Sequence, residues 1–236
     1  MKRNFVSIVI PTFNEEKNIE NTLRAIKNQD WKRYEVIVSD AKSEDRTRAI
    51  ARKYGAKVVI DERKGIGAGR NFGARFARGD ILLFIDADSV VMWNTISELV
   101  KQFQKKTVVG ATCAILPLRA TAKNVAFYAT YNKFAERSMK RSPIIAGVCA
   151  AYRKKDFDAV GGFDEKMAAF EDTALSRTIA KRGRLVFTYN TFILTSPRRV
   201  EQWGFSKIAK KYVRFYFRLR SRKNIPLNEY RPIRSG

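Results

Sequence analysis

The chain has 236 residues and a mass of 27.1 kDa, which suits one substantial hydrophobic core and excludes a miniprotein held together by disulfide bonds. Its hydrophobic content of 45% excludes a disordered chain, because such chains lack the apolar side chains that offset the loss of conformational entropy. The 47 Lys and Arg residues exceed the 23 Asp and Glu residues, and the net charge of +24 indicates attraction to phosphate-bearing partners.

The sequence contains no histidine, which excludes Ser-His-Asp and Cys-His catalysis and His-ligated zinc. A catalytic base must therefore be a carboxylate, Lys, Tyr or Cys. Cys113 and Cys149 lie in apolar stretches without metal-ligand spacing, so we expect buried free thiols and a reducing compartment. No apolar run is long enough to cross a bilayer and no signal peptide is recognisable, so a cytoplasmic location is expected.

The first ninety residues alternate between short apolar runs and helical patterns. The predicted strands are residues 5–10, 34–39, 57–60 and 81–85, and the predicted helices begin at Asn14, at Ser43 and around Phe72. Such alternation is typical of an α/β fold, with a mostly parallel, Rossmann-like sheet that has helices on both faces.

The second half changes its order of elements. Its first predicted element is a helix that carries Ile96 and Leu99. The predicted strands that follow are residues 108–116, 145–152 and 185–194, and the predicted helices are about residues 121–140 and 172–182. Mixed strand directions are therefore expected here. We divide the chain into a body of residues 1–199, with halves meeting near residue 105, and a basic tail of residues 200–236.

Acidic and polar residues follow the predicted strands, where open α/β sheets bind ligands. Glu15 follows the first strand, Asp40 the second, and Asp86 and Asp88 the fourth. Residues two apart in an extended segment point to one side, so Asp86 and Asp88 can converge, and a divalent cation would relieve their repulsion. Oxygen ligands favour Mg²⁺ or Mn²⁺ holding a diphosphate, although such triplets are also common in plain surface turns.

Residues 65–73 are rich in glycine, but they fit neither GxGxxG nor a P-loop, which argues against a dehydrogenase and a P-loop ATPase. We interpret them as a flexible loop leading to Arg70, a side chain suited to phosphate contact, with a plain turn and a solvated arginine as the alternative.

A second acidic pair, Glu171 and Asp172, precedes a predicted helix. Either residue could simply cap that helix. The functional interpretation is a general base, because a chain without histidine needs a carboxylate to take a proton from an attacking hydroxyl.

Together these segments resemble the inverting family 2 glycosyltransferases of the GT-A fold. The matching segments, in the family's order across roughly residues 5 to 200, are VSIVIPTFNEE at 6–16, the stretch from Asp40 to Thr47, AGRNFG at 68–73, FIDAD at 84–88, GGFDE at 161–165 and Glu171-Asp172. The resemblance implies a donor half at about residues 1–105 and an acceptor half at about 106–199.

The resemblance also implies roles for individual residues. Pro11, Thr12, Glu15 and Asp40 would lie near the base and ribose of a UDP- or GDP-sugar, and Arg70 near its diphosphate. Asp86 would face the ribose or the metal, and Asp88 the metal, Mn²⁺ or Mg²⁺. Asp172, beside Glu171, would deprotonate the acceptor hydroxyl, which then attacks the anomeric carbon from the face opposite the leaving diphosphate.

Three features depart from or extend the family pattern. The second aspartate that often follows the second strand is Ala41, and the usual glycine is Lys42, so the choice of base stays open. The late histidine of some relatives has no counterpart. Ser196-Pro197-Arg198-Arg199 is similar to a Ser-x-Arg-Arg stretch in certain members, and we expect both arginines to neutralise phosphate, with a solvated basic turn as the alternative.

The tail of residues 200–236 carries ten Lys or Arg against two Asp or Glu. From Ile208 onward apolar residues recur at helical spacing, which predicts a basic amphipathic helix that either packs on the body or lies on an anionic membrane at the inner face. Membrane contact would favour a lipid-linked acceptor, either a polyprenyl phosphate or a growing lipid-linked glycan, so that the sugar is transferred to a hydroxyl or to a phosphate.

Two other functions compete with a glycosyltransferase. The charge and the aromatics of the tail are compatible with a nucleic-acid-binding module, but such a module has no need of the grouped carboxylates. A sugar nucleotidyltransferase would usually carry a Gly-rich loop with a basic residue after the first strand, where this chain has Pro11-Thr12-Phe13-Asn14.

Overall fold

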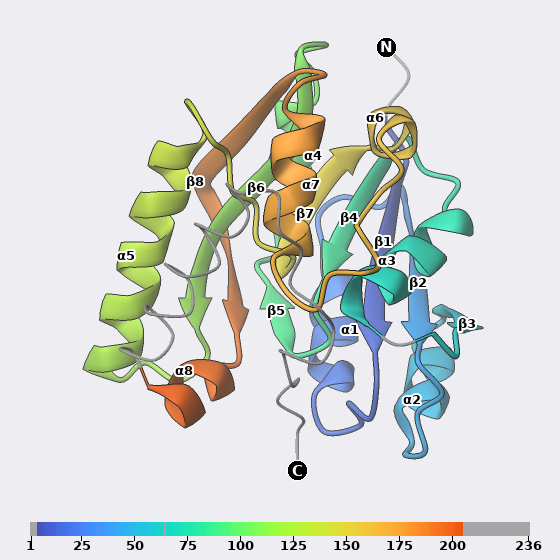
Figure 1. Cartoon of the computed structure of the whole chain (residues 1–236). Coiled ribbons are helices and arrows are strands. Elements are labelled where there is room, and N and C mark those ends of the chain that lie inside the picture. The colour runs from blue at the N-terminus through green and yellow to red at the C-terminus, as the bar shows by residue number, and fades with distance from the viewer. Residues whose placement is uncertain (1–3, 64, 205–236) are drawn as a thin grey trace.

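One eight-stranded sheet forms the centre of the molecule, and helices cover both of its faces (Figure 1). The structure is a computed structural model that describes residues 4–63 and 65–204. The strand order is β3-β2-β1-β4-β7-β6-β8-β5. The strands are β1 (Val6–Thr12), β2 (Tyr34–Asp40), β3 (Lys57–Ile60), β4 (Ile81–Ile85), β5 (Ser89–Val91), β6 (Val108–Pro117), β7 (Cys149–Arg153) and β8 (Arg184–Thr195).

The sheet has a parallel half and a mixed half that meet at β4. Strands β3, β2, β1 and β4 run parallel, as the alternation of strands and helices predicts. Strand β7 is antiparallel to both β4 and β6, β6 and β8 are parallel, and β5 runs antiparallel to β8. The prediction of an α/β fold with a mostly parallel sheet and a mixed second half is therefore confirmed.

The sheet faces differ in the helices that cover them. The helices are α1 (Ile19–Lys27), α2 (Thr47–Lys53), α3 (Ile66–Arg75), α4 (Thr95–Gln102), α5 (Ala122–Ser138), α6 (Lys154–Ala159), α7 (Glu171–Ile179) and α8 (Arg198–Trp203). Alternate residues of β4 point to opposite faces. Ile81, Leu83 and Ile85 join the core with α1, α2, α4 and α5, whereas Leu82 and Phe84 join the core with α3, α6 and α7. Figure 1 shows α3 and α7 in front of the sheet.

Two predicted helix starts are wrong. The first helix begins at Ile19 rather than at Asn14, because Asn14 has a φ of 53° and the backbone N–H groups of residues 14–16 are bound by side chains of the next loop. The second helix begins at Thr47 rather than at Ser43, because the Ser43 hydroxyl donates to Asp40 instead of capping it.

The glycine-rich segment is also different from its prediction. It is not a flexible loop but most of helix α3, which begins at Ile66. Its glycines let the helix lie very close to the sheet: a Cβ on Gly73 would meet Val9 Cγ1 at 2.5 Å. Helix α3 therefore carries Arg70 in a fixed position rather than on a mobile loop.

The sequence patterns missed three short elements, β5, α6 and α8. Each has only three to six residues, which is too short for a hydrophobic periodicity to be recognised. The predicted amphipathic helix lies beyond Gly204, outside the described residues. Among those that are described, no helix combines the length and apolar character needed to span a membrane.

Candidate active site

The residues predicted to carry chemistry converge where β1, β2 and β4 end. Thr12 and Asp40 are the last residues of β1 and β2, and Asp86 follows the last residue of β4 directly. Asp86 and Asp88 are part of a turn, in which the backbone N–H of Ser89 donates to Asp86 O at 3.2 Å, and not of an extended segment as predicted. The two carboxylates still lie close enough for the charge of Asp86 to raise the pKa of Asp88.

Arg70 connects the two acidic motifs of the site. Its Nη2 donates to Asp86 Oδ1 at 2.8 Å and its Nη1 donates to Glu171 Oε1 at 2.7 Å. Only 2% of the Arg70 surface is exposed. Burial opposes the charge of Arg70, but Asp86 and Glu171 outweigh it and raise its pKa. A permanently charged guanidinium thus joins the end of β4 to the start of α7.

This geometry differs from the predicted role of Arg70 at a donor diphosphate. Both terminal nitrogens are bonded to carboxylates of the protein, and Arg70 Nε is buried without an acceptor among the described residues. A phosphate would have to displace the buried ion pair with Glu171 or the partly exposed one with Asp86. This geometry favours a positioning role for Arg70, and its contact with a diphosphate stays a prediction.

The segment before β7 closes the other side of this cluster. Gly147 packs against the Arg70 guanidinium so tightly that a Cβ on Gly147 would overlap it. The backbone N–H of Gly147 donates to Asp172 Oδ2 at 2.9 Å. Asp172 Oδ1 accepts from its neighbour Thr173 N at 2.6 Å. These bonds hold the half-buried Asp172 carboxylate in one orientation, next to the Arg70 cluster.

Glu171 is the more buried member of the acidic pair, with 4% of its surface exposed. Burial, helped by the neighbouring charge of Asp172, raises the pKa of Glu171 to about 7, although Arg70 acts in the opposite direction. Glu171 is bonded to Arg70 inside the protein, whereas Asp172 is the member that is partly exposed. Of the two, Asp172 is therefore the better placed to meet a substrate.

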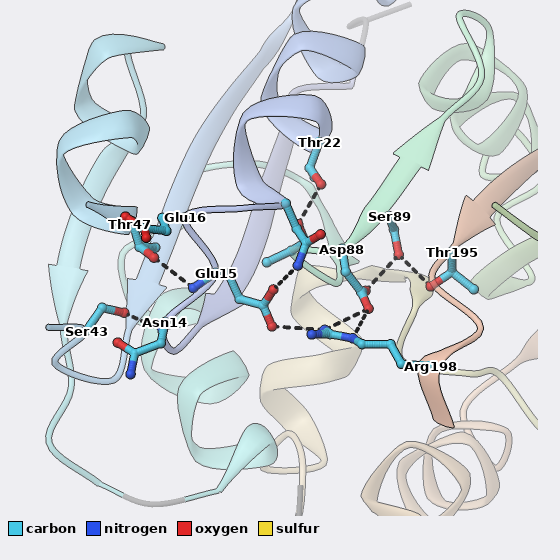
Figure 2. Close-up of polar contacts among 12 residues, drawn as sticks. Asn14, Glu15, Glu16, Thr22, Ser43, Thr47, Asp88, Ser89, Thr195 and Arg198 are labelled. Atoms are coloured by element: carbon cyan, nitrogen blue, oxygen red, sulfur yellow. Dashed lines mark hydrogen bonds and ion pairs between the residues drawn. The ribbon is translucent and has the colours of Figure 1, made fainter. Parts of the chain in front are cut away.

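Arg198 bridges two carboxylates, one in the loop after β1 and one in the loop after β4 (Figure 2). Its Nη2 lies 3.0 Å from Glu15 Oε1 and 2.9 Å from Asp88 Oδ2, and its Nε donates to the same Asp88 oxygen at 3.2 Å. Its Nη1 is buried and finds no acceptor among the described residues. Arg198 thus joins α8 to the loops after β1 and β4 and keeps one donor available.

Asp88 has an unusual protonation equilibrium. Burial, followed by the charges of Asp86 and Glu15, raises the pKa of Asp88 to about 6, while Arg198 lowers it. A carboxylate that is both buried and crowded by like charges is stabilised by added positive charge. The Asp88 position therefore favours a cation.

The predicted contacts with the base are occupied within the protein. Asp40 is fully buried and accepts hydrogen bonds from Thr12 Oγ1, Ser43 N and Ser43 Oγ at 2.9, 2.8 and 2.6 Å. Thr12 is 5% exposed. Asp40 and Thr12 therefore shape the loop after β2 in this conformation, while Pro11 is half-buried and 3.6 Å from the position of a Cβ on Gly69.

Two further residues build the site without having been predicted individually. Gly147 has no motif around it, and only its packing on Arg70 reveals its role. Asn71 was part of the AGRNFG motif but had no assigned role. Its amide donates to Phe163 O at 2.8 Å and accepts from Phe163 N at 2.9 Å, which fixes the GGFDE segment to α3. The side chain of Arg199, which was predicted to bind phosphate, lies outside the described part of the chain.

Comparison with known proteins gives this arrangement a family. The family model "Glycosyl transferase family 2" matches residues 7–161. Glycosyltransferase AglE of Haloferax volcanii is 39% identical over 92 residues, which are 36% of this chain and 30% of the relative. A GalNAc(5)-diNAcBac-PP-undecaprenol beta-1,3-glucosyltransferase of Campylobacter jejuni is 29% identical over 104 residues, 41% of this chain and 34% of the relative. The matches cover about a third of either relative.

Solved structures share the fold of this chain. A mannosyltransferase of Pyrobaculum calidifontis, in complex with GDP-Man and Mn²⁺, matches 83% of this chain and 58% of its own with a TM-score of 0.71 at 26% identity. TarS of S. aureus, in complex with UDP-GlcNAc, matches 81% of this chain and 58% of its own with a TM-score of 0.66 at 21% identity. These likenesses show the GT-A fold. Since the family model spans residues 7–161, which are more than half of the chain, this protein belongs to glycosyl transferase family 2.

Proposed function

We propose that the protein is an inverting glycosyltransferase that moves a sugar from a nucleoside-diphosphate sugar to an acceptor hydroxyl, with the help of a divalent cation. One observation carries the proposal: Arg70 joins Asp86, at the end of β4, to Glu171, beside Asp172. The residues proposed for the donor and for the acceptor are thereby held at one end of the sheet. Inversion requires that the donor and acceptor sites adjoin, because the base and the leaving diphosphate act on the same sugar carbon from opposite faces.

The cation fits the residues that are present. Within residues 4–63 and 65–204 no three Asp, Glu or Cys side chains form a complete metal site. Mg²⁺ and similar ions are, however, often bound through one or two carboxylates together with substrate phosphates. Asp88, buried and with a raised pKa, and Asp86 next to it would supply those carboxylates. When bound, the cation would stabilise the charge that develops on the leaving diphosphate.

Arg198 is the proposed diphosphate ligand of the protein. It lies beside Asp88, the residue proposed to hold the cation to which the diphosphate would bind. Its Nη1 is without an acceptor among the described residues. A phosphate oxygen would satisfy this nitrogen with a charge-assisted hydrogen bond. We extend this role to Arg199 on the strength of the sequence alone.

Asp172 is the proposed general base. The Gly147 N–H and the backbone of Thr173 orient its carboxylate, and its partial exposure leaves room for an acceptor hydroxyl. As the hydroxyl oxygen attacks the anomeric carbon, Asp172 takes its proton and the bond to the diphosphate breaks. Arg70 holds Glu171 and Asp86 around this centre.

The donor and acceptor are proposed as classes. The solved relatives bind GDP-Man or UDP-GlcNAc, so the donor is proposed to be a UDP- or GDP-sugar. The name of the Campylobacter jejuni relative contains an undecaprenol diphosphate, which supports a polyprenyl-linked acceptor and peripheral contact with an anionic membrane. The net charge of +24 is compatible with such a surface.

A thermal-shift panel tests the proposal. The protein is heated with UDP, GDP, dTDP or CMP, each with and without Mn²⁺ or Mg²⁺. We expect one nucleoside diphosphate to raise the melting temperature by several degrees, and to do so only with the metal. Asp172→Asn should keep this shift and lose sugar transfer, whereas Asp88→Ala should lose the shift.

A different result would point to a different function. If no nucleotide stabilises the protein, while single-stranded RNA binds tightly in low salt and dissociates in high salt, the nucleic-acid-binding module would replace the transferase. If Asp172→Asn transfers sugar at the wild-type rate, another residue must be the base.

A further inference from the structure

The two cysteines of the chain lie side by side in the core, although 35 residues (114–148) separate them in sequence. Cys113 belongs to β6 and Cys149 is the first residue of β7. Their Sγ atoms are 3.7 Å apart, and both residues are fully buried. Both are free thiols, as the sequence predicts.

The positions of the two thiols also suit a bond between them. Strands β6 and β7 are antiparallel and pair Gly110 with Tyr152 and Ala111 with Ala151, so the ladder ends two residues away from each cysteine. The Sγ–Sγ distance of 3.7 Å exceeds the length of a disulfide bond, about 2.05 Å, by less than 2 Å. Small rotations of the two side chains would close the remaining gap.

We propose that Cys113 and Cys149 form a reversible disulfide that fastens β7 to β6 beside the active site. The oxidant is proposed to be a peroxide, because a small uncharged molecule can enter a buried site more easily than a bulky disulfide. One thiol reacts with hydrogen peroxide to give a sulfenic acid and water. The second thiol then displaces hydroxide from that sulfur, which gives the disulfide and a second water.

The disulfide would lie close enough to the candidate active site to affect the segment that contains Gly147. The ladder between β6 and β7 stops after Ala111 and Ala151, and the pairing of β6 with β8 shifts register between Cys113 and Ala114. Backbone pairing is therefore interrupted where the thiols meet. Only Val148 separates Cys149 from Gly147, which packs on Arg70 and donates to Asp172. A covalent link here would hold the Gly147 segment in place.

The reaction should be slow at neutral pH. The contact with Cys149 and burial raise the pKa of the Cys113 thiol, and the thiolate is the reactive form. Oxidation is therefore expected to accelerate from pH 7 to pH 9. The reduced form would be stable in a reducing compartment, and the link would form under oxidative load.

Intact-mass and peptide analysis of the full chain tests this proposal. After treatment with hydrogen peroxide the mass should fall by two hydrogen atoms, and a tryptic digest without reductant should contain residues 107–119 linked to residues 142–153. The melting temperature should rise by about 10 °C, because the bond closes a loop of about 35 residues. Dithiothreitol should reverse both changes.

Single variants serve as matched controls. Cys113→Ala and Cys149→Ala should show neither the linked peptides nor the rise, while circular dichroism checks that each is folded. The proposal is wrong if, in the wild-type chain, both cysteines are alkylated after peroxide and denaturation, or if they gain oxygen atoms separately. Because the readouts are mass and melting temperature, the test is independent of the proposed transferase activity.

Discussion

Gly147 lies directly against the guanidinium of Arg70, and a Cβ at this position has no room unless Arg70 shifts. We predict that Gly147→Ala lowers the stability by about 2 kcal/mol, because the added methyl group must push Arg70 away from Asp86 and Glu171. Sugar transfer should fall with it, since the Gly147 N–H also orients Asp172. Urea unfolding and a transfer assay check both effects. Gly69→Ala is the stability control, because a Cβ there would meet its nearest neighbour at an ordinary 3.6 Å.

Replacing Arg70 itself should be more damaging. In Arg70→Met the buried carboxylate of Glu171 and the partly exposed carboxylate of Asp86 lose their shared partner. Removing the partner of a buried charge costs about 3 to 5 kcal/mol. Arg70→Lys should recover part of the stability but not the bidentate geometry. Chemical denaturation measures these differences. Arg78→Ala, which removes an exposed pair with Glu35, should cost less than about 1 kcal/mol. Similar losses for Arg70→Met and Arg78→Ala would disprove the positioning role.

The raised pKa of Glu171 predicts how stability depends on pH. Between about pH 4.5 and pH 7 the folded protein keeps a proton on Glu171 that the unfolded chain releases, so stability falls as the pH rises through this window. The loss across the whole window should be about 3.5 kcal/mol, given about 1.4 kcal/mol for each pKa unit. Denaturation at pH 5 and pH 7.5 measures it. Glu171→Gln should flatten the slope, whereas Glu62→Gln, on the surface, should leave it unchanged. An equal slope in wild type and Glu171→Gln would contradict the assignment.

Arg198 should affect metal and nucleotide in opposite directions. Without nucleotide the guanidinium competes with a cation for Asp88, so Arg198→Ala should bind Mn²⁺ more tightly. The same variant should bind the nucleoside diphosphate about tenfold more weakly in the presence of Mn²⁺, because a charge-assisted hydrogen bond is lost. Calorimetric titration separates the two affinities. Arg119→Ala, which removes an ion pair to Glu201 in α8, is the matched control. Weaker binding of both ligands would refute the competition.

The fold could be predicted largely from strand patterns. The short strands β1, β2, β3 and β4 are separated by polar loops, so their order follows from sequence. Their burial differs, because β1 and β4 are almost wholly buried whereas only Val59 is buried in the edge strand β3. Helix starts were less accurate where side chains of a distant loop take up the backbone N–H groups, as at Asn14. Glycine usually breaks helices, and the helical state of residues 66–75 depends on contact with Val9 and Ser39, which the local sequence does not reveal.

The site was predicted as a set of residues but not as a network. Asp86 and Asp88 were identified because they follow an apolar run directly, and Glu171 and Asp172 because an acidic pair precedes a predicted helix. These patterns could not show that Arg70 would be bonded to both acidic motifs, since its partners are 16 and 101 residues away. A lone glycine such as Gly147 carries no signal of its own in a single sequence.

Strand β4 has its neighbour β1 running the same way and its neighbour β7 running the opposite way. Under the proposed function, this reversal would place β4 at the boundary between two modules, one that binds the activated sugar and one that binds the acceptor. A chimera joined just after Asp88 could then exchange the receiving module while retaining the first. Such a chimera must keep Gly147 and Glu171, because both residues contact Arg70.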